Sequence, residues 1–180
     1  MLNNLTKDQF LNKRNLCVFC GSSDGRETTL QQSIKQLGHF MAESNIGLVY
    51  GGANIGIMGQ LANQVLQHQG KVFGVIPKKI YNLEVGHEGL TQLILTKTMH
   101  ERKEKMYQLS DAFLVLPGGI GTLEEFLETL TWIQLGFHRK PLFLFNHNNH
   151  FQFLLKHLEF LLAQGFLHRD TLTKLIFATM

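Results

Sequence analysis

The sequence predicts an α/β fold, namely a Rossmann-like three-layer α/β/α sandwich with a mostly parallel sheet. Short apolar runs alternate with amphipathic stretches from end to end of the 180 residues, which is the order of strands and crossover helices in such a sheet. Two of the runs lead into glycine-rich turns that open helices, as strand-to-helix corners do in doubly wound folds. We find neither an internal repeat nor a linker, so we expect one domain over residues 1–180, with residues 1–15 as a peripheral N-terminal segment.

The predicted strands are short runs that are apolar at nearly every position, the pattern of strands buried on both faces of a parallel sheet. They occupy residues 16–20, 47–50, 72–76, 93–95, 112–116 and 142–145. The helix after the first strand places apolar side chains on one face at helical spacing, namely Leu30, Ile34, Leu37 and Met41. Two later helices show the same period, through Met58, Leu61 and Val65 and through Leu154, Leu158, Leu161 and Leu162. We therefore expect all three helices to pack on the sheet.

Composition and charge narrow the functional class. Hydrophobic residues make up 44% of the chain, enough for a full core, and no segment reaches the roughly 20 apolar residues of a membrane span. Residues 1–15 lack the apolar core of a signal peptide, which predicts a cytoplasmic protein without a membrane partner. The net charge is only +3 and the Lys and Arg residues are scattered, which disfavours a nucleic-acid partner and fits a small anionic ligand.

Neither the cysteines nor the histidines form a metal motif. Cys17 and Cys20 fall in one predicted strand, where a spacing of three places their side chains on opposite faces. We expect them to be buried thiols that share neither a metal nor a disulfide. His147 and His150 flank a polar loop without a cysteine or an acid at ligand spacing, and we expect them to be solvated. The sequence therefore predicts no metal site and no cofactor.

The most informative segment is the predicted corner after the strand at 112–116. Gly118, Gly119 and Gly121 follow this strand at close spacing, and Thr122 stands where the next helix begins. Closely spaced glycines let a backbone approach a ligand with its N–H groups pointing outward, and a helix N-terminus favours an anion. This corner therefore predicts a phosphate site.

Glu124 and Glu125 complicate that prediction, because they fall on the first predicted turn of the helix. Their negative charge would repel a phosphate unless one carboxylate faces another part of the ligand, which would indicate chemistry. A structural interpretation is also open, since Thr122 and Glu125 have the Thr-x-x-Glu spacing of a capping box.

A second glycine cluster, within residues 49–59, also runs from a strand into a helix and contains Gly51, Gly52, Gly56 and Gly59. A G-x-G-x-x-G fingerprint is absent and no acid follows the strand at 72–76, so a dinucleotide is not expected. Ile57 and Met58 stand where a P-loop has Lys and Ser or Thr, which disfavours a nucleoside triphosphate and leaves a monophosphate. The alternative is that these glycines only permit tight turns and close helix packing.

A third segment is predicted to lie at the same site, because ligands of such sheets bind beyond the carboxyl ends of the strands. Residues 99–103 open the helix after the strand at 93–95. Arg102 in this segment could reach a phosphate or a ring while Glu125 approaches from a neighbouring strand end, which gives a cation and an acid on one ligand. The alternative is a solvated helix face with an i,i+4 pair of Glu101 and Lys105.

These residues resemble the LONELY GUY family of phosphoribohydrolases, long labelled lysine decarboxylase-like. The resemblance rests on Pro117-Gly118-Gly119-x-Gly121-Thr122-x-x-Glu125, on Met99-His100-x-Arg102-Lys103 and on Gly51-Gly52. It extends from Cys20-Gly21-Ser22-Ser23 to Trp132-x-Gln134-Leu135-Gly136 and Lys140-Pro141, about two thirds of the chain. One departure is visible, because the family has a Pro and a Tyr where residues 24–28 read Asp-Gly-Arg-Glu-Thr here.

The resemblance implies a homodimeric enzyme that hydrolyses the N-glycosidic bond of AMP or of its N6-prenylated cytokinin forms, with the free base and ribose 5-phosphate as products. Arg102 and Glu125 would be its catalytic pair. The residues that would bind the substrate are Ser22, Gly51, Gly52, Gly56, Met58, Gly59, Met99, Gly118, Gly119, Gly121 and Thr122, with Glu124 as a candidate for the ribose hydroxyls.

Two other functions stay open. A non-catalytic carrier of a nucleotide or of the molybdenum cofactor would use the same glycine corners, but it would not need both Arg102 and Glu125. A broader nucleosidase would act on other purine or pyrimidine monophosphates. Apolar residues late in the motif helix are expected either in a dimer interface or in ordinary core packing. They are Trp132, Ile133, Leu135 and Phe137.

Overall fold

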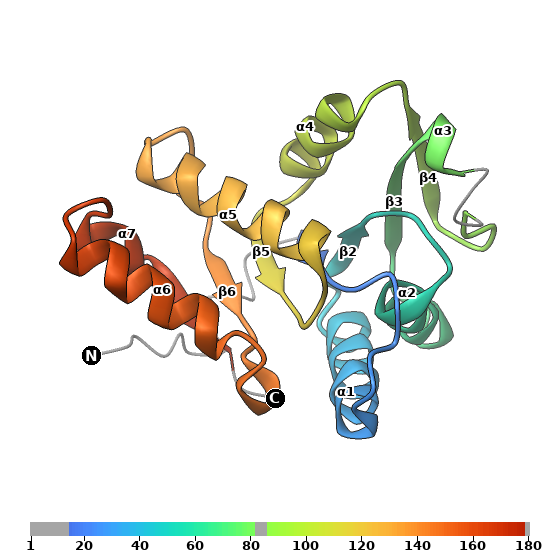
Figure 1. The fold of residues 1–180 in the computed structure, drawn as a ribbon. Helices are drawn as coiled ribbons and strands as arrows, with labels where there is room; N and C mark the ends of the chain where they lie inside the picture. Colours follow the sequence, from blue (N-terminus) through green and yellow to red (C-terminus); the bar gives the residue numbers. More distant parts are fainter. Residues whose placement is uncertain (1–14, 82–85, 179–180) are drawn as a thin grey trace.

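The computed structural model describes residues 15–81 and 86–178, so the predicted N-terminal segment, apart from Asn15, lies outside the described residues. One seven-stranded sheet has the strand order β4-β3-β2-β1-β5-β6-β7 (Figure 1). Its strands are β1 (Asn15–Phe19), β2 (Gly47–Tyr50), β3 (Val72–Pro77), β4 (Gln92–Thr96), β5 (Ala112–Val115), β6 (Leu142–Leu144) and β7 (Leu175–Phe177). Neighbouring strands of this sheet all run parallel, which confirms the predicted α/β class.

Helices connect the strands and cover both faces of the sheet (Figure 1). They are α1 (Thr28–Glu43), α2 (Gly56–Gln67), α3 (Lys78–Tyr81), α4 (Met99–Leu109), α5 (Ile120–Gln134), α6 (Gln152–Ala163), α7 (Arg169–Thr173) and the 3-10 helix η2 (His147–Asn149). The strands separate two hydrophobic cores, one formed with α1 and α2 and the other with α4, α5 and α6. The side chains of β1 alternate between them, so that Val18 enters the first core and Phe19 the second. This confirms the predicted three layers.

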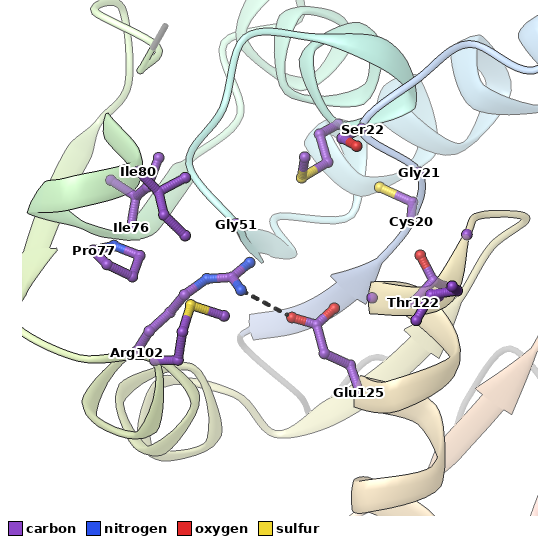
Figure 2. Close-up of a pocket in the computed structure, with 15 residues that line it drawn as sticks. Cys20, Gly21, Ser22, Gly51, Ile76, Pro77, Ile80, Arg102, Thr122 and Glu125 are labelled. Carbon is purple, nitrogen blue, oxygen red and sulfur yellow. Dashed lines mark ion pairs between the residues drawn. The ribbon is translucent and has the colours of Figure 1, made fainter. Parts of the chain in front are cut away.

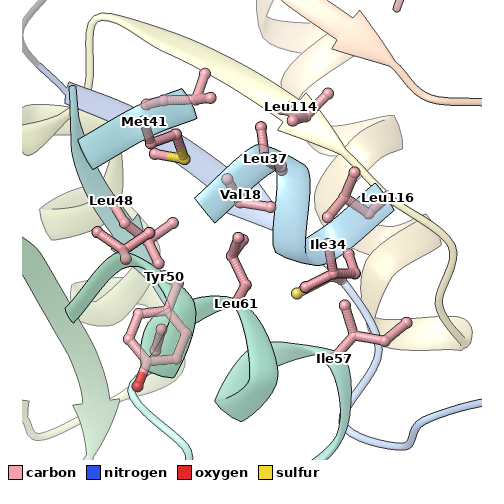
Figure 3. Close-up of a cluster of buried hydrophobic side chains, with 14 of the residues drawn as sticks. Val18, Ile34, Leu37, Met41, Leu48, Tyr50, Ile57, Leu61, Leu114 and Leu116 are labelled. Atoms are coloured by element: carbon pink, nitrogen blue, oxygen red, sulfur yellow. The ribbon is translucent and has the colours of Figure 1, made fainter. Parts of the chain in front are cut away.

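The core beneath α1 and α2 is built from the predicted apolar stripes. Ile34, Leu37 and Met41 of α1 and Leu61 of α2 gather over Val18 of β1 (Figure 3). All five side chains are buried. The helical period read from the sequence therefore identifies the face of each helix that packs on the sheet.

The C-terminal part of the fold differs more from its prediction. Leu158 of α6 is buried, whereas Leu154, Leu161 and Leu162 are only partly buried. The sequence did not predict α3, α7 and β7, because these elements are too short to show a hydrophobic period. None of the described helices, α6 included, has the length and apolar character that a membrane span requires.

Cys17 and Cys20 belong to opposite cores and are buried free thiols, as predicted. Burial raises the pKa of both thiols, and the nearby charge of Glu125 raises it further. Both side chains therefore stay protonated and behave as small apolar groups.

The order of the strands reverses beside β1. The chain adds β2, β3 and β4 on one side of β1 and then β5, β6 and β7 on the other. In sheets of this type a crevice opens at the reversal, beyond the carboxyl ends of the strands. Two turns meet there, since Gly21 after β1 donates its N–H to the Pro117 carbonyl after β5 at 3.2 Å.

Candidate active site

A cavity of about 250 Å³ lies at the carboxyl ends of β1, β2, β3 and β5 (Figure 2). It brings together most of the site residues predicted from the sequence, namely Ser22, Gly51, Met58, Met99, Arg102, Gly119, Gly121, Thr122 and Glu125. Because the carboxyl ends of parallel strands meet at one edge of the sheet, segments far apart in the sequence can line one cavity.

Arg102 and Glu125 form an ion pair in this cavity, with 3.3 Å between Nη1 and Oε1 (Figure 2). Both side chains are mostly buried, with 14% and 11% of their surfaces exposed. The Nε–H of Arg102 also donates to the Val75 carbonyl at 3.1 Å, which fixes the guanidinium against the end of β3. Arg102 is therefore not part of a solvated helix face, and that alternative is wrong.

The start of α4 explains how Arg102 is held. Thr98 caps this helix, since its Oγ1 accepts the Glu101 N–H at 3.1 Å. The Glu101 carboxylate in turn accepts the Lys97 N–H at 2.7 Å. This reciprocal arrangement is close to a capping box. The Glu101 carboxylate therefore serves the cap, whereas the alternative of a solvated helix face paired it with Lys105. The cap therefore fixes the first turn of α4, from which Arg102 extends into the cavity.

The predicted capping box of Thr122 and Glu125 is wrong. Helix α5 begins at Ile120 with Gly119 as its N-cap, and no side chain caps it. Glu124 and Glu125 consequently lie in the second turn of the helix and not in the first. The reason is that the glycines allow the helix to begin before Thr122.

The N-terminus of α5 faces the cavity. The first bond within the helix runs from the Leu123 N–H to the Gly119 carbonyl at 3.1 Å. The N–H groups of residues 119–122 are therefore those that a helix leaves without a partner inside it. All four of these residues line the cavity. Such a helix end favours an anion.

Burial raises the pKa of Glu125 above the ordinary range of a glutamate. The positive charge of Arg102 lowers this pKa and the negative charge of Glu124 raises it, so the net direction is upward. A carboxylate whose pKa is raised is a stronger base than an exposed glutamate. Glu125 is therefore suited to accept a proton inside the cavity.

The glycines that line the cavity have two kinds of surroundings. A methyl group on Gly51 would lie 2.5 Å from Nη2 of Arg102, so glycine lets the turn after β2 approach the guanidinium. A methyl group on Gly119 or Gly121 would have no heavy atom within 4 Å. The start of α5 therefore leaves open space beside its backbone.

Gly52, Gly56 and Gly59 do not line the cavity. Gly56 has a φ of +57° and packs directly against the backbone of Ser22. For these three glycines the structure agrees with the alternative of tight turns and close packing.

Gly118 and Glu124 also lie outside the cavity lining. The Glu124 side chain is 51% exposed and pairs with Lys103, whose Nζ also lies 3.2 Å from Glu128. This arrangement ties α4 to α5 beside the cavity. The predicted contact of Glu124 with ribose has no support from its position.

The cavity has an apolar wall that the sequence analysis missed. Its residues are Ile76 and Pro77 of β3 and Ile80 of α3, while Cys20 after β1 adds an apolar side chain on the other side of the cavity (Figure 2). A signal was available, because β3 ends at the same edge of the sheet as β1 and β2, and residues at a strand end belong to the crevice.

The prediction that His147 and His150 are solvated is wrong for His147 and confirmed for His150, which is exposed. His147 is 13% exposed, and its Nε2 lies 3.1 Å from Thr29 Oγ1 and 3.5 Å from a carboxylate oxygen of Glu27. His150 Nε2 lies 3.3 Å from the Gly118 nitrogen. These partners are distant in the sequence, so no local pattern could indicate them. Across residues 15–81 and 86–178, no group of three or more His, Cys, Asp or Glu side chains is placed to hold a metal ion.

Comparison with known sequences gives close relatives. Residues 58–180 match a family model described as possible lysine decarboxylase. A cytokinin riboside 5'-monophosphate phosphoribohydrolase of Rhodococcoides fascians is 44% identical over 91% of this chain and 83% of its own length. One from Arabidopsis thaliana is 44% identical over 89% of this chain and 74% of its own length.

Solved structures share the fold. The molybdenum cofactor binding protein from Rippkaea orientalis superposes with a TM-score of 0.68 at 23% identity, covering 93% of this chain and 90% of that one. The Moco carrier protein from Chlamydomonas reinhardtii gives a TM-score of 0.64 at 18% identity, with 93% and 90% coverage. At these identities only the fold is shared. On the sequence matches, which are much closer, the chain belongs to the LONELY GUY family of phosphoribohydrolases.

Proposed function

We propose that this protein is an enzyme that hydrolyses the N-glycosidic bond of a nucleoside 5'-monophosphate, AMP or N6-prenylated AMP, to the free base and ribose 5-phosphate. One observation carries the proposal: the buried carboxylate of Glu125, paired with Arg102, shares a cavity with the uncapped N-terminus of α5. The relatives named for cytokinin riboside 5'-monophosphates support this substrate class.

The N-terminus of α5 is the proposed site of the 5'-phosphate. Its N–H groups and the field of the helix favour an anion, and the space in front of Gly119 and Gly121 is open. Glu125 lies three residues after Thr122 on the same helix, which is about one turn, or roughly 5 Å, farther along the axis. A ribose whose phosphate binds at the helix end would thus present its anomeric carbon to Glu125.

Glu125 and Arg102 have different roles in the proposed reaction. Breaking the bond between the anomeric carbon and the base develops positive charge on the ribose ring, which the Glu125 carboxylate stabilises. In the proposed hydrolysis, the carboxylate also accepts a proton from the attacking water, whose oxygen bonds to the anomeric carbon as the C–N bond breaks. The base leaves with the electron pair of that bond and takes up one proton, so that the free base is neutral and Glu125 returns to its ionised form. Arg102 orients the carboxylate and the substrate. The binding energy of the remote phosphate positions the reacting carbon.

The apolar wall is the proposed site of the base. Ile76, Pro77 and Ile80 face Arg102 across the cavity (Figure 2), and the side chains of Met58 and Met99 line the same space. Apolar and polarizable side chains of this kind bind a flat ring or a hydrocarbon substituent by burying it from water.

The rival functions fit this cavity less well. A decarboxylase that used pyridoxal phosphate would need a lysine for the Schiff base, and none of the described residues that line the cavity is a lysine. A non-catalytic carrier needs a site for the anion of its ligand but no buried carboxylate beside the ligand, so it would not require Glu125. A broader nucleosidase differs only in the base that it accepts, and it is separated by the substrate panel below.

We also propose a cytoplasmic homodimer. Trp132 packs on Tyr107 with 4.3 Å between ring centroids, and Ile133 is buried, so these residues serve the core. Leu135 and Phe137 are 61% and 72% exposed, and apolar side chains of this size are typical of interface centres. Light scattering at micromolar concentration should give twice the chain mass of 20.5 kDa. A mass equal to that of one chain would contradict the dimer.

Incubation with AMP, N6-prenylated AMP, GMP and CMP tests the function directly. Chromatography should detect free base and ribose 5-phosphate in equal amounts from AMP or its prenylated form. Comparable release from GMP and CMP would favour the broader nucleosidase. Tight binding of AMP without release of any base would favour the carrier and reject the proposal.

A further inference from the structure

The turn before α5 is held from two sides. On one side, the Gly21 N–H after β1 donates to the Pro117 carbonyl at 3.2 Å. On the other side, Nε2 of His150 lies 3.3 Å from the nitrogen and 3.1 Å from the oxygen of Gly118. A single imidazole nitrogen is therefore within bonding distance of both polar groups of the residue that precedes the proposed phosphate site.

Neighbouring residues hold the side chain of His150 in place. It follows the 3-10 helix η2, and its ring lies edge-on against Phe151 with 4.7 Å between ring centroids. Phe151 is buried, and its N–H donates to Oδ1 of Asn146 at 2.8 Å. The support consists of the end of β6 and the start of α6, neither of which lines the catalytic cavity. The imidazole is exposed, and elements outside the cavity hold it beside the turn.

His150 is not among the residues that line the catalytic cavity. It lines an adjoining hollow of about 330 Å³ together with Gly118, and Gly119 lines both spaces. The neutral ring either accepts the Gly118 N–H or donates to the Gly118 carbonyl, according to its tautomer. In either case it fixes the orientation of this residue's peptide groups. The N–H groups that remain for an anion are those that follow, from Gly119 onward.

We infer that His150 is a positioning residue for substrate phosphate: by holding Gly118, it fixes the direction of the N–H groups at the start of α5. The inference rests on the proposed function for the identity of the anion. It explains why a histidine bonds to a turn whose own residues supply only backbone groups to the site. Substrate binding through the phosphate should therefore depend on a side chain outside the cavity lining.

The first experiment measures binding without turnover. Calorimetry with ribose 5-phosphate should show that His150→Ala weakens binding roughly tenfold, in the range of one lost hydrogen bond. His150→Gln should restore most of the affinity, because its amide can reach Gly118 with either a donor or an acceptor. His157→Ala is the matched control, since His157 is an exposed histidine of α6 that only stacks on Phe160. Unchanged affinity in a folded His150→Ala protein, or an equal loss in His157→Ala, would overturn the inference.

The second experiment measures turnover. For AMP, His150→Ala should raise KM roughly tenfold while kcat changes much less, and for adenosine, which lacks the phosphate, kcat/KM should stay unchanged. An equal loss of kcat/KM with AMP and adenosine would indicate a general structural defect and reject a role in phosphate positioning. If no nucleotide is hydrolysed but ribose 5-phosphate binding falls as expected, the proposed function fails while the role of His150 at the anion site stands.

Discussion

The two strand-to-helix corners of this protein look alike in the sequence but have different structures. Between β2 and α2, Gly56 packs against the backbone of Ser22, and the Met58 N–H donates to the Gly21 carbonyl at 3.3 Å. The start of α2 is therefore occupied by the protein itself. Between β5 and α5, Gly119 and Gly121 have open space beside them and the helix start lines the cavity.

Glycine therefore has two different roles at these corners. In the corner before α2, the missing side chain lets two backbone segments touch. In the corner before α5, it leaves a helix N-terminus accessible to a ligand. Of the two corners that the sequence predicts to share one anion site, the corner before α5 is the one whose helix start faces open space. The corner before α2 contributes Gly51 and Met58 to the wall of the cavity.

The largest effect should come from the carboxylate of the open corner. Glu125→Gln keeps the size of the side chain but can neither accept a proton nor stabilise a positive sugar. We expect the variant to fold and bind AMP while kcat falls by roughly a hundredfold to ten-thousandfold, the usual range for a lost acid or base. Steady-state kinetics with AMP, together with thermal unfolding, would measure both properties.

Glu124→Gln is the matched control for that variant. Glu124 is the preceding residue on α5, but its side chain is half-exposed and pairs with Lys103 outside the cavity. Its kcat should stay within a few-fold of wild type. Near-normal kcat in Glu125→Gln, or an equal loss in Glu124→Gln, would move the catalytic assignment away from Glu125.

The next effect tests the packed corner through stability. Gly56→Ala would put a side chain at a φ of +57° and against the Ser22 backbone. Left-handed backbone and overpacking together should lower the free energy of unfolding by about 2–4 kcal/mol. Urea unfolding followed by circular dichroism would measure this. A variant as stable as wild type would show that the corner before α2 is not as closely packed as the structure indicates.

A smaller effect should appear at the open corner, and in binding instead of stability. Gly121→Ala lies in the first turn of α5, where alanine is compatible with the helix and its methyl group meets no protein atom within 4 Å. The free energy of unfolding should change by less than about 1 kcal/mol. The methyl group would intrude on the phosphate, so KM for AMP should rise roughly tenfold, equivalent to about 1.4 kcal/mol. Unchanged KM would indicate that the phosphate binds elsewhere.

The contrast between the corners also explains what the sequence could predict. Apolar runs and helical periods identified six of the strands and the faces of α1 and α2, because burial on a sheet leaves a local pattern. Strand ends of a parallel sheet meet at one edge, so Arg102 and Glu125 could be placed together without a structure. A local pattern could not tell which glycines pack against backbone and which face open space. Whether a glycine faces a backbone or open space depends on segments distant in the sequence, as Gly56 and Ser22 show.

The same limit applies to long-range contacts that the sequence could not indicate. His150 bonds to a residue 32 positions away, and His147 to one 118 positions away. Helix α3, which supplies Ile80 to the apolar wall, is a single short turn. Contacts of this kind depend on how loops fold over the sheet, and no local period encodes them.

The smallest effect concerns pH and again distinguishes the two corners, because Glu125 of α5 is the only carboxylate among the described residues that line the cavity. Glu125 must be ionised to act as a base, so activity is lost as pH falls through its pKa. Since burial raises this pKa, the acid limb of kcat/KM should lie above the ordinary glutamate value of 4.5. Removing the positive charge in Arg102→Gln should move the limb to higher pH, whereas removing the negative charge in Glu124→Gln should move it to lower pH. Gly56→Ala, at the packed corner, should leave it in place wherever the variant stays folded. Shifts of the same sign in both charge variants would show that a group other than Glu125 controls the acid limb.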